Sequence, residues 1–102
     1  MLELRPNCEH CDKGLPANSK EARICSYECT FCSSCVENIL LNVCPNCGGG
    51  FENRPIRPAK SYRENVGLEF QPASGKRVRG KHSAADIDDF SDRLAHLAPE
   101  QR

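Results

Sequence analysis

Eight cysteines lie between Cys8 and Cys47, and no cysteine follows in the rest of the 102-residue chain. They form four close pairs, and a short gap lets both thiolates of a pair reach one ion from a tight turn. Structural zinc is normally held by four such ligands, and soft thiolates favour zinc over hard cations. The spacing therefore predicts two zinc ions, held by the pairs Cys8/Cys11, Cys25/Cys29, Cys32/Cys35 and Cys44/Cys47.

The stretch ECTFCSSC, residues 28–35, also permits other chemistry. Its three cysteines match the start of the C-x2-C-x2-C-x3-C-P run that holds an iron–sulfur cluster, and a Cys-Pro pair follows at Cys44. However, eight residues rather than three separate Cys35 from Cys44. Disulfides are a further alternative, but they require an oxidising compartment. We expect zinc, with an iron–sulfur or redox protein as a weaker alternative.

The spacing leaves open how the four pairs are shared between two ions. Sequential pairing joins neighbouring pairs, nested pairing joins the outer two and the inner two, and cross-braced pairing joins alternate pairs. All three give two sites of four cysteines.

The segment ECTFCSSCVENILLNVCPNCGG resembles the second half of a RING finger, which reads C-x-H-x-F-C-x2-C, then a short helix, then C-P-x-C. Cys29 stands at the usual histidine position, Phe31 before the fifth ligand and Pro45 after the seventh. The resemblance covers about residues 8–50 and implies a cross-brace. Zinc 1 would then be held by Cys8, Cys11, Cys32 and Cys35, and zinc 2 by Cys25, Cys29, Cys44 and Cys47.

The head, from LELRPNC to RPIRPA, also resembles a family of small bacterial cysteine-rich proteins catalogued as domain of unknown function 1272. That resemblance implies no activity. RING ubiquitin ligases usually place an aliphatic residue between the first two ligands and often a Trp in the groove for the conjugating enzyme. This chain has Glu9 and His10 there and no Trp, so ligase activity is not implied.

The fold class expected is a small metal-stapled α+β domain at residues 1–52, RING-like, with a short hairpin and one short helix. ARIC (22–25) and Thr30–Phe31 favour the hairpin. Val36, Ile39, Leu40 and Val43 recur at helical spacing, which predicts a helix over 35–42. An apolar core alone is marginal in so small a domain, so we expect the metal sites to stabilise it.

Residues 53–82 differ in composition, being rich in Pro, Gly and basic side chains. The stretch 53–81 carries a net charge of +6, between acidic segments on either side. This composition predicts a flexible linker that is solvated or docks on the thiolate-rich head. Alternatively, residues 54–81 contact nucleic-acid phosphates.

A final helix is expected over residues 84–97, within a C-terminal segment 83–98. Ser83 can cap it, with Asp86 three residues further on. Ile87, Phe90, Leu94 and Leu97 fall on one helical face, which can pack on the head or bind a partner.

The remaining features indicate a non-enzymatic interaction module. Closed four-cysteine sites lack the open position of a catalytic zinc, and we expect His10, His82 and His96 to be solvated. The N-terminus MLELRPNCEH has no apolar segment typical of a signal peptide, and no run is long enough to span a membrane. We therefore expect a cytoplasmic protein with no membrane contact and an unidentified protein partner.

Overall fold

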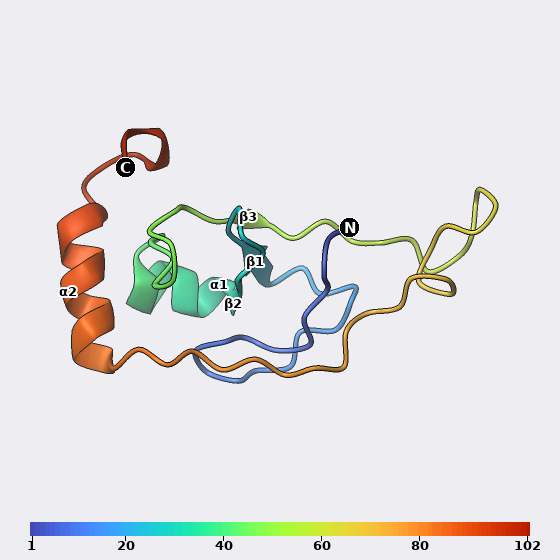
Figure 1. Cartoon of the computed structure of the whole chain (residues 1–102), viewed down its shortest axis with the longest axis horizontal. Coiled ribbons are helices and arrows are strands. Elements are labelled where there is room, and N and C mark those ends of the chain that lie inside the picture. Colours follow the sequence, from blue (N-terminus) through green and yellow to red (C-terminus); the bar gives the residue numbers. More distant parts are fainter.

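A three-stranded antiparallel sheet lies at the centre of the computed structural model, which describes all 102 residues (Figure 1). Strands β1 (Ala22–Ile24) and β2 (Thr30–Cys32) form the hairpin that the sequence predicted, with Ile24 opposite Thr30. Strand β3 (Glu52–Asn53) pairs with the other edge of β1, so the order is β2-β1-β3. The two-residue strand β3 was not expected.

One continuous helical segment follows β2 directly. Helix α1 (Ser33–Cys35) runs into the π-helical turn η1 (Val36–Leu40), so the predicted helix exists but begins earlier than expected. It ends where Leu41 and Asn42 adopt left-handed conformations, with φ of 52° and 59°. A π turn is wider than an α turn, which explains why Ile39 is 37% exposed although the α-helical pattern placed it inward.

The core of the head is built largely from cysteine. Six of the thirteen residues in the buried cluster are cysteines. The rings of Phe31 and Phe51 meet edge to face, with centroids 5.4 Å apart and an interplanar angle of 73°. Such aromatic pairs are favourable beyond their buried area, and this one joins β2 to the chain just before β3. Because cysteines make up almost half of this cluster, the state of the thiols affects the packing of the core.

Residues 54–83 contain no helix or strand. Their first half forms a loop that projects from the body (yellow in Figure 1), where the amide of Leu68 donates to the carbonyl of Pro58 at 2.9 Å. The guanidinium of Arg57 holds the base of this loop, donating to the carbonyls of Gln71 and Leu2 at 2.7 Å each. The second half returns along the head. The division into domain, flexible linker and helix remains a prediction.

Helix α2 (Ala84–Leu94) lies at the end of the molecule opposite the projecting loop (Figure 1). As predicted, the Ser83 side chain caps it, accepting from the amide of Asp86 at 3.1 Å. The helix ends three residues before the expected Leu97, and a 3-10 turn, η2 (Pro99–Gln101), follows. Ile87 is buried, and α2 packs against η1. No helix in the chain combines the length and the apolar character needed to cross a membrane.

Candidate metal centre

The first cysteine cluster draws on two distant parts of the chain. Its four sulfur atoms all lie within 4.8 Å of one another. Cys32 ends β2 and Cys35 ends α1, while the other two cysteines come from the loop near the N-terminus. The members of this cluster are Cys8, Cys11, Cys32 and Cys35.

A tight turn positions the N-terminal pair of this cluster. The amide of Cys8 donates to the carbonyl of Lys13 at 2.8 Å, and the amide of Asp12 donates back to Cys8 at 2.9 Å. Asp12 itself has a φ of 67°, a left-handed conformation that Asp tolerates better than most residues. The turn places Cys11 Sγ 3.8 Å from Cys32 Sγ. Tetrahedral zinc with Zn–S bonds of about 2.3 Å separates its sulfurs by about 3.8 Å, so this pair already has that spacing.

The second cysteine cluster comprises Cys25, Cys44 and Cys47, whose sulfurs lie within 4.8 Å of one another, with Cys29 at its edge. The Cys29 thiol is buried and hydrogen-bonds with that of Cys25, but it is not within 4.8 Å of all three others. The turn between β1 and β2 holds this pair, because the amide of Cys25 donates to the carbonyl of Cys29 at 3.2 Å. The donor set is thus four cysteines, one of them farther out.

Backbone amides point at two sulfurs of the second cluster. The amide of Tyr27 donates to Cys25 Sγ at 3.3 Å, and the amide of Gly49 donates to Cys47 Sγ at 3.4 Å. Hydrogen bonds to a charged acceptor favour its charged form. These amides therefore suit thiolates, which are the metal-binding form of cysteine.

The clusters interleave along the chain. Alternate pairs come together, which is the cross-brace order rather than the sequential or nested one. Cys29 and Cys32 face different clusters although only Thr30 and Phe31 separate them. Side chains alternate between the two faces of a strand, so the odd spacing across β2 directs these two cysteines apart.

Burial raises the pKa of four of the thiols. It is the largest cause for Cys35 and Cys44, whose pKa values rise far above that of an ordinary thiol. Burial also raises the pKa of Cys8 and Cys29. Cys11 differs: burial opposes ionisation, but hydrogen bonds from the Lys13 backbone and neighbouring thiols outweigh it and lower its pKa. A cation at each cluster would reverse this preference, because coordinated thiols lose their protons.

The donor chemistry fits a soft or borderline metal. Every donor is sulfur, all eight cysteines are free of disulfides, and six of them are buried. Thiolate sets of this kind hold zinc or iron–sulfur clusters and do not suit Mg²⁺ or Ca²⁺. No histidine belongs to either cluster.

Four contacts around the clusters were not anticipated from the sequence. Asn46 hydrogen-bonds with the thiol of Cys29 and, through its Oδ1, with His82 Nε2 at 3.0 Å. The buried carboxylate of Glu9 accepts from Arg5 at 2.8 Å and from the amide of Thr30 at 2.5 Å, which ties the first loop to β2. No local pattern reveals these partners, because all except Arg5 are far away in the sequence, such as Thr30 from Glu9 and His82 from Asn46.

The fold and clusters define a small cysteine-rich α+β protein with two four-cysteine groups in a cross-brace-like arrangement. Residues 1–57 match the family described as "Protein of unknown function (DUF1272)", and the chain belongs to this family. It is also 53% identical over 78 residues to an uncharacterized protein of Rhizobium meliloti (strain 1021), covering 76% of this chain and 86% of that protein. No solved structure matches the chain.

Proposed function

We propose that this protein is a non-enzymatic zinc-binding module in which two zinc ions stabilise a domain that binds another protein. The observation that carries the proposal is the interleaving of eight free thiols into two groups, one of four sulfurs and one of three sulfurs with Cys29 at its edge. In this proposal zinc 1 is held by the first cluster and zinc 2 by Cys25, Cys29, Cys44 and Cys47. A RING-like cross-brace in the cytoplasm, where thiols stay reduced, is the form of the module that we propose.

A structural rather than catalytic role follows from the donor sets. Catalytic zinc keeps a coordination position for water or substrate, whereas four protein thiolates close the tetrahedron. Binding free energies of about 10 kcal/mol or more per structural zinc are comparable with the whole stability of a small domain. Loss of both zinc ions would then unfold the head.

A groove beside the sheet supports the protein-binding part of the proposal. It has a volume of ≈ 330 Å³ and lies between η1 and the β1–β3 edge, where Leu41 is 44% exposed. Apolar and charged side chains mix along it, as at transient protein interfaces. Its lining includes Arg23, Val36, Glu37, Leu41, Phe51 and Glu52.

Native mass spectrometry of the purified protein, with elemental analysis, tests the zinc assignment. Two zinc ions per chain in a colourless preparation are expected. Iron with visible absorbance, or a metal-free folded chain, would contradict it.

In-cell cross-linking tests the protein-binding part. The wild type should capture a partner, and so should Ile56→Asp, a change at an exposed loop site. Leu41→Asp, a change in the groove, should not.

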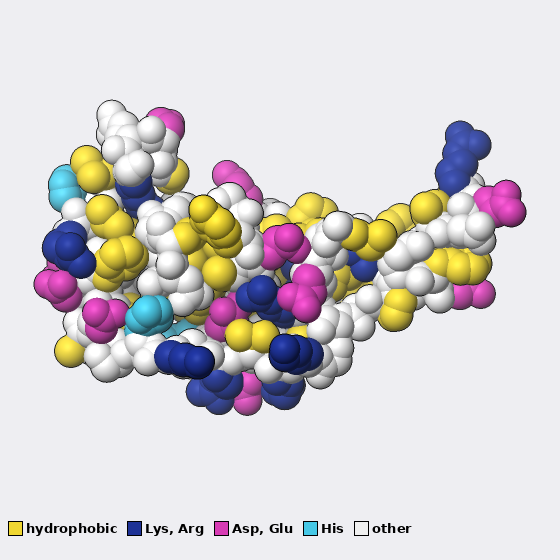
Figure 2. Space-filling view, viewed as in Figure 1, with side chains coloured by type: hydrophobic (Ala, Val, Ile, Leu, Met, Phe, Trp, Pro, Cys, Tyr) yellow, Lys and Arg dark blue, Asp and Glu magenta, His cyan; other side chains and the backbone are white.

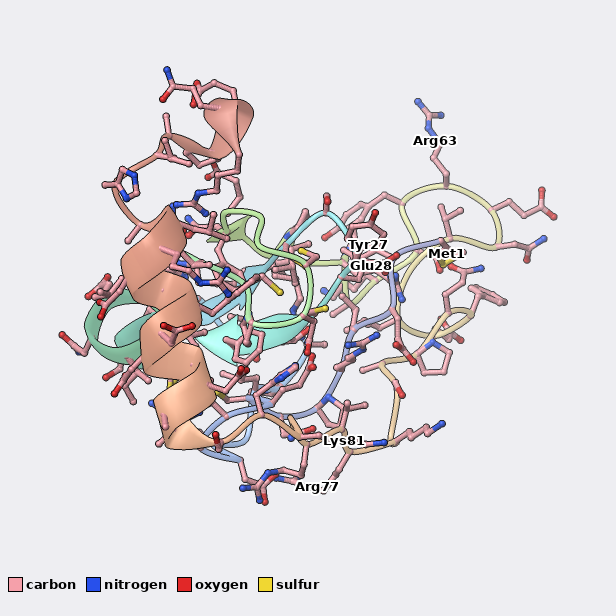
Figure 3. The ribbon with its side chains drawn as sticks, turned by 60° about the vertical axis from the view of Figure 1, so that its left-hand side comes forward. Met1, Tyr27, Glu28, Arg63, Arg77 and Lys81 are labelled. Carbon is pink, nitrogen blue, oxygen red and sulfur yellow. The ribbon has the colours of Figure 1, made fainter.

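Nucleic-acid binding is the second candidate, and one observation favours it. Residues 77–81 run extended beside the first loop, because Val78 exchanges two hydrogen bonds with the Asn7 side chain at 2.8 and 3.1 Å. Alternate residues of this fixed segment are basic and exposed, so they form a row rather than a loose tail. Basic side chains gather along this lower edge in Figure 2, and Figure 3 labels Arg77 and Lys81 on it.

Asp12 counters part of this basic row. Its carboxylate lies 2.7 Å from Arg77 and 3.5 Å from Arg79, so two of the cations are already paired within the protein.

Fluorescence anisotropy with a single-stranded oligonucleotide distinguishes nucleic-acid binding from protein binding. The nucleic-acid function predicts binding that weakens steeply with salt and is lost in Arg79→Glu/Lys81→Glu. Salt-independent or undetectable binding at micromolar protein leaves the protein-binding module.

A further inference from the structure

The C-terminal segment, residues 83–102, rests on the turn that carries two sulfurs of the second cluster. This turn, residues 44–50, is closed by two backbone hydrogen bonds. Gly48 donates to the carbonyl of Cys44 at 2.7 Å, and Cys44 donates to the carbonyl of Gly49 at 2.8 Å. Any change in the positions of Cys44 and Cys47 therefore changes the surface that the turn offers to helix α2.

The contact is close because the turn has glycines where α2 and η2 approach. A Cβ atom on Gly48 would lie 3.2 Å from Leu94 Cδ1 and 3.5 Å from Phe90 Cζ, and one on Gly50 would lie 2.8 Å from Pro99 Cγ. Gly48 also has a φ of 81°, a conformation that side chains disfavour. The fit thus requires both the glycines and the conformation that the turn adopts around its cysteines.

Polar contacts fasten both ends of the segment to the same region. Directly before it, His82 hydrogen-bonds with Asn46, which lies between Cys44 and Cys47 and also contacts the Cys29 thiol. At its end, one nitrogen of Arg102 donates to the carbonyls of Asn42 at 2.8 Å and Gly48 at 3.2 Å. The segment is therefore held at both ends by residues of, or next to, the second cluster.

Helix α2 needs this support to stay folded. It has eleven residues, and isolated helices shorter than about 12–15 residues are marginal in water. Its buried side chains are Ile87, which belongs to the same core as the cysteines, and Ser91. An undocked α2 would consequently unfold and leave apolar surface uncovered on the head.

We propose that metal at the second cluster and docking of residues 83–102 are one coupled equilibrium. Metal fixes the 44–50 turn on which the segment docks, and the docked segment in turn holds the metal in place. Loss of this one ion then releases α2 and exposes the apolar side chains of α2 and of the head that meet in the docked state. The inference rests on metal binding as proposed above, and it assigns the second cluster a regulatory role that the first does not share.

Hydrogen–deuterium exchange on the full chain tests whether loss of metal at the second cluster releases α2, with a matched pair of variants. Cys47→Ser and Cys11→Ser each remove the second cysteine of a pair, and these are the two exposed cysteines. Cys47→Ser should speed exchange of the α2 amides by about fivefold or more, while the β1 and β2 amides stay protected. Cys11→Ser should leave α2 exchange nearer to that of the wild type. Equal protection of α2 in both variants overturns the proposal.

A second experiment tests whether docking of α2 holds the metal at the second cluster. It leaves all eight cysteines in place, so it does not depend on a cysteine variant folding. Ile87→Asp should undock α2, and Ile56→Asp introduces the same charge at an exposed site. Thiol alkylation mapped by mass spectrometry, with a competing chelator, should show Cys44 and Cys47 of Ile87→Asp reacting about fivefold or more faster than in wild type. Cys8 and Cys11 should be unchanged, as should every cysteine in Ile56→Asp.

The outcomes separate the two proposals. Two metals by native mass spectrometry with unchanged Cys44 and Cys47 reactivity in Ile87→Asp overturn the coupling alone. A wild-type chain that binds no metal overturns the proposed function and the coupling together.

Discussion

The hydroxyl of Ser91 donates a hydrogen bond of 2.9 Å to the carbonyl of Leu40, 51 residues earlier in the chain, with both groups buried. The Leu40 carbonyl lies at the end of η1, where it also accepts from the amide of Val43. This bond links α2 to the head at the centre of their contact. Because a hydrogen bond is directional, it fixes the position of α2 relative to η1 more closely than apolar packing alone would.

Ser91→Ala should weaken α2 docking by about 1 kcal/mol, the usual net value of a buried hydrogen bond. Because Leu40 keeps its second partner, a larger effect is not expected. Hydrogen exchange of the α2 amides measures the change. Ser61→Ala, in the exposed projecting loop, should leave exchange unaltered, and a similar change in both variants would contradict the role of this bond.

Cys32→Ser and Cys29→Ser should each cost the protein one zinc, but a different one. Cys32 belongs with Cys8 and Cys11, whereas Cys29 lies beside Cys25. Native mass spectrometry should give one zinc per chain for each variant. Alkylation should then label Cys8 and Cys11 in Cys32→Ser, and Cys44 and Cys47 in Cys29→Ser. The same cysteines becoming reactive in both variants would show that the clusters are not separate.

Strong chelation should unfold residues 1–52. Six of the thirteen core residues are cysteines, so removing the metals would leave buried thiols and few aliphatic contacts in their place. In an NMR spectrum the amide dispersion of the head should collapse when zinc is removed and return when zinc is added back. Retained dispersion in the zinc-free protein would contradict a metal-dependent fold.

Metal binding should release protons near neutral pH. Burial raises the pKa of Cys8 and Cys35 in the first cluster and of Cys29 and Cys44 in the second. A metal must displace the protons of these thiols, and its affinity therefore falls as pH falls. For two protonated thiols at a site the loss is about 100-fold per pH unit. Calorimetry in buffers of different ionisation enthalpy counts the protons, and a count near zero would contradict the prediction.

Arg54→Met should destabilise the head by about 3 kcal/mol or more, since hydrogen bonds to a charged group are worth about 1.5–3 kcal/mol each. The buried guanidinium donates to the carbonyls of Arg5 at 2.8 Å, Pro16 at 2.9 Å and Leu15 at 3.2 Å. Its loss would leave the carbonyls of Arg5 and Leu15 without this donor, whereas the carbonyl of Pro16 keeps the amide of Ser19 at 2.9 Å. Denaturant unfolding of the zinc-loaded protein measures the effect. Arg63→Met, at the tip of the projecting loop (Figure 3), should change stability by no more than a few tenths of a kcal/mol.

Much of the head could be predicted from the sequence because its determinants are local. Cysteine spacing predicted two four-cysteine groups, β-favouring residues predicted the hairpin, and Ser83 marked the start of α2. Resemblance to a RING finger indicated the cross-brace order, which spacing alone left open. The helical spacing predicted a helix here, but not that Val36–Leu40 would form a π turn.

Contacts between distant residues account for what the sequence did not reveal. Arg54 lies in a basic, proline-rich stretch that looks solvated, yet it is 3% exposed. Arg102 is at the end of the chain and still contacts Asn42 and Gly48. Strand β3 has two residues and no pattern of its own. Each depends on where the chain returns in space, which residue type and spacing do not encode.

The interleaved clusters impose an order on synthesis. The first donor set is complete once Cys35 has left the ribosome, whereas the second must wait for Cys47. The helix that covers the second cluster is made later still. A nascent chain can therefore capture its first ion before its second, and residues 83–102 can dock only after both donor sets have been synthesised.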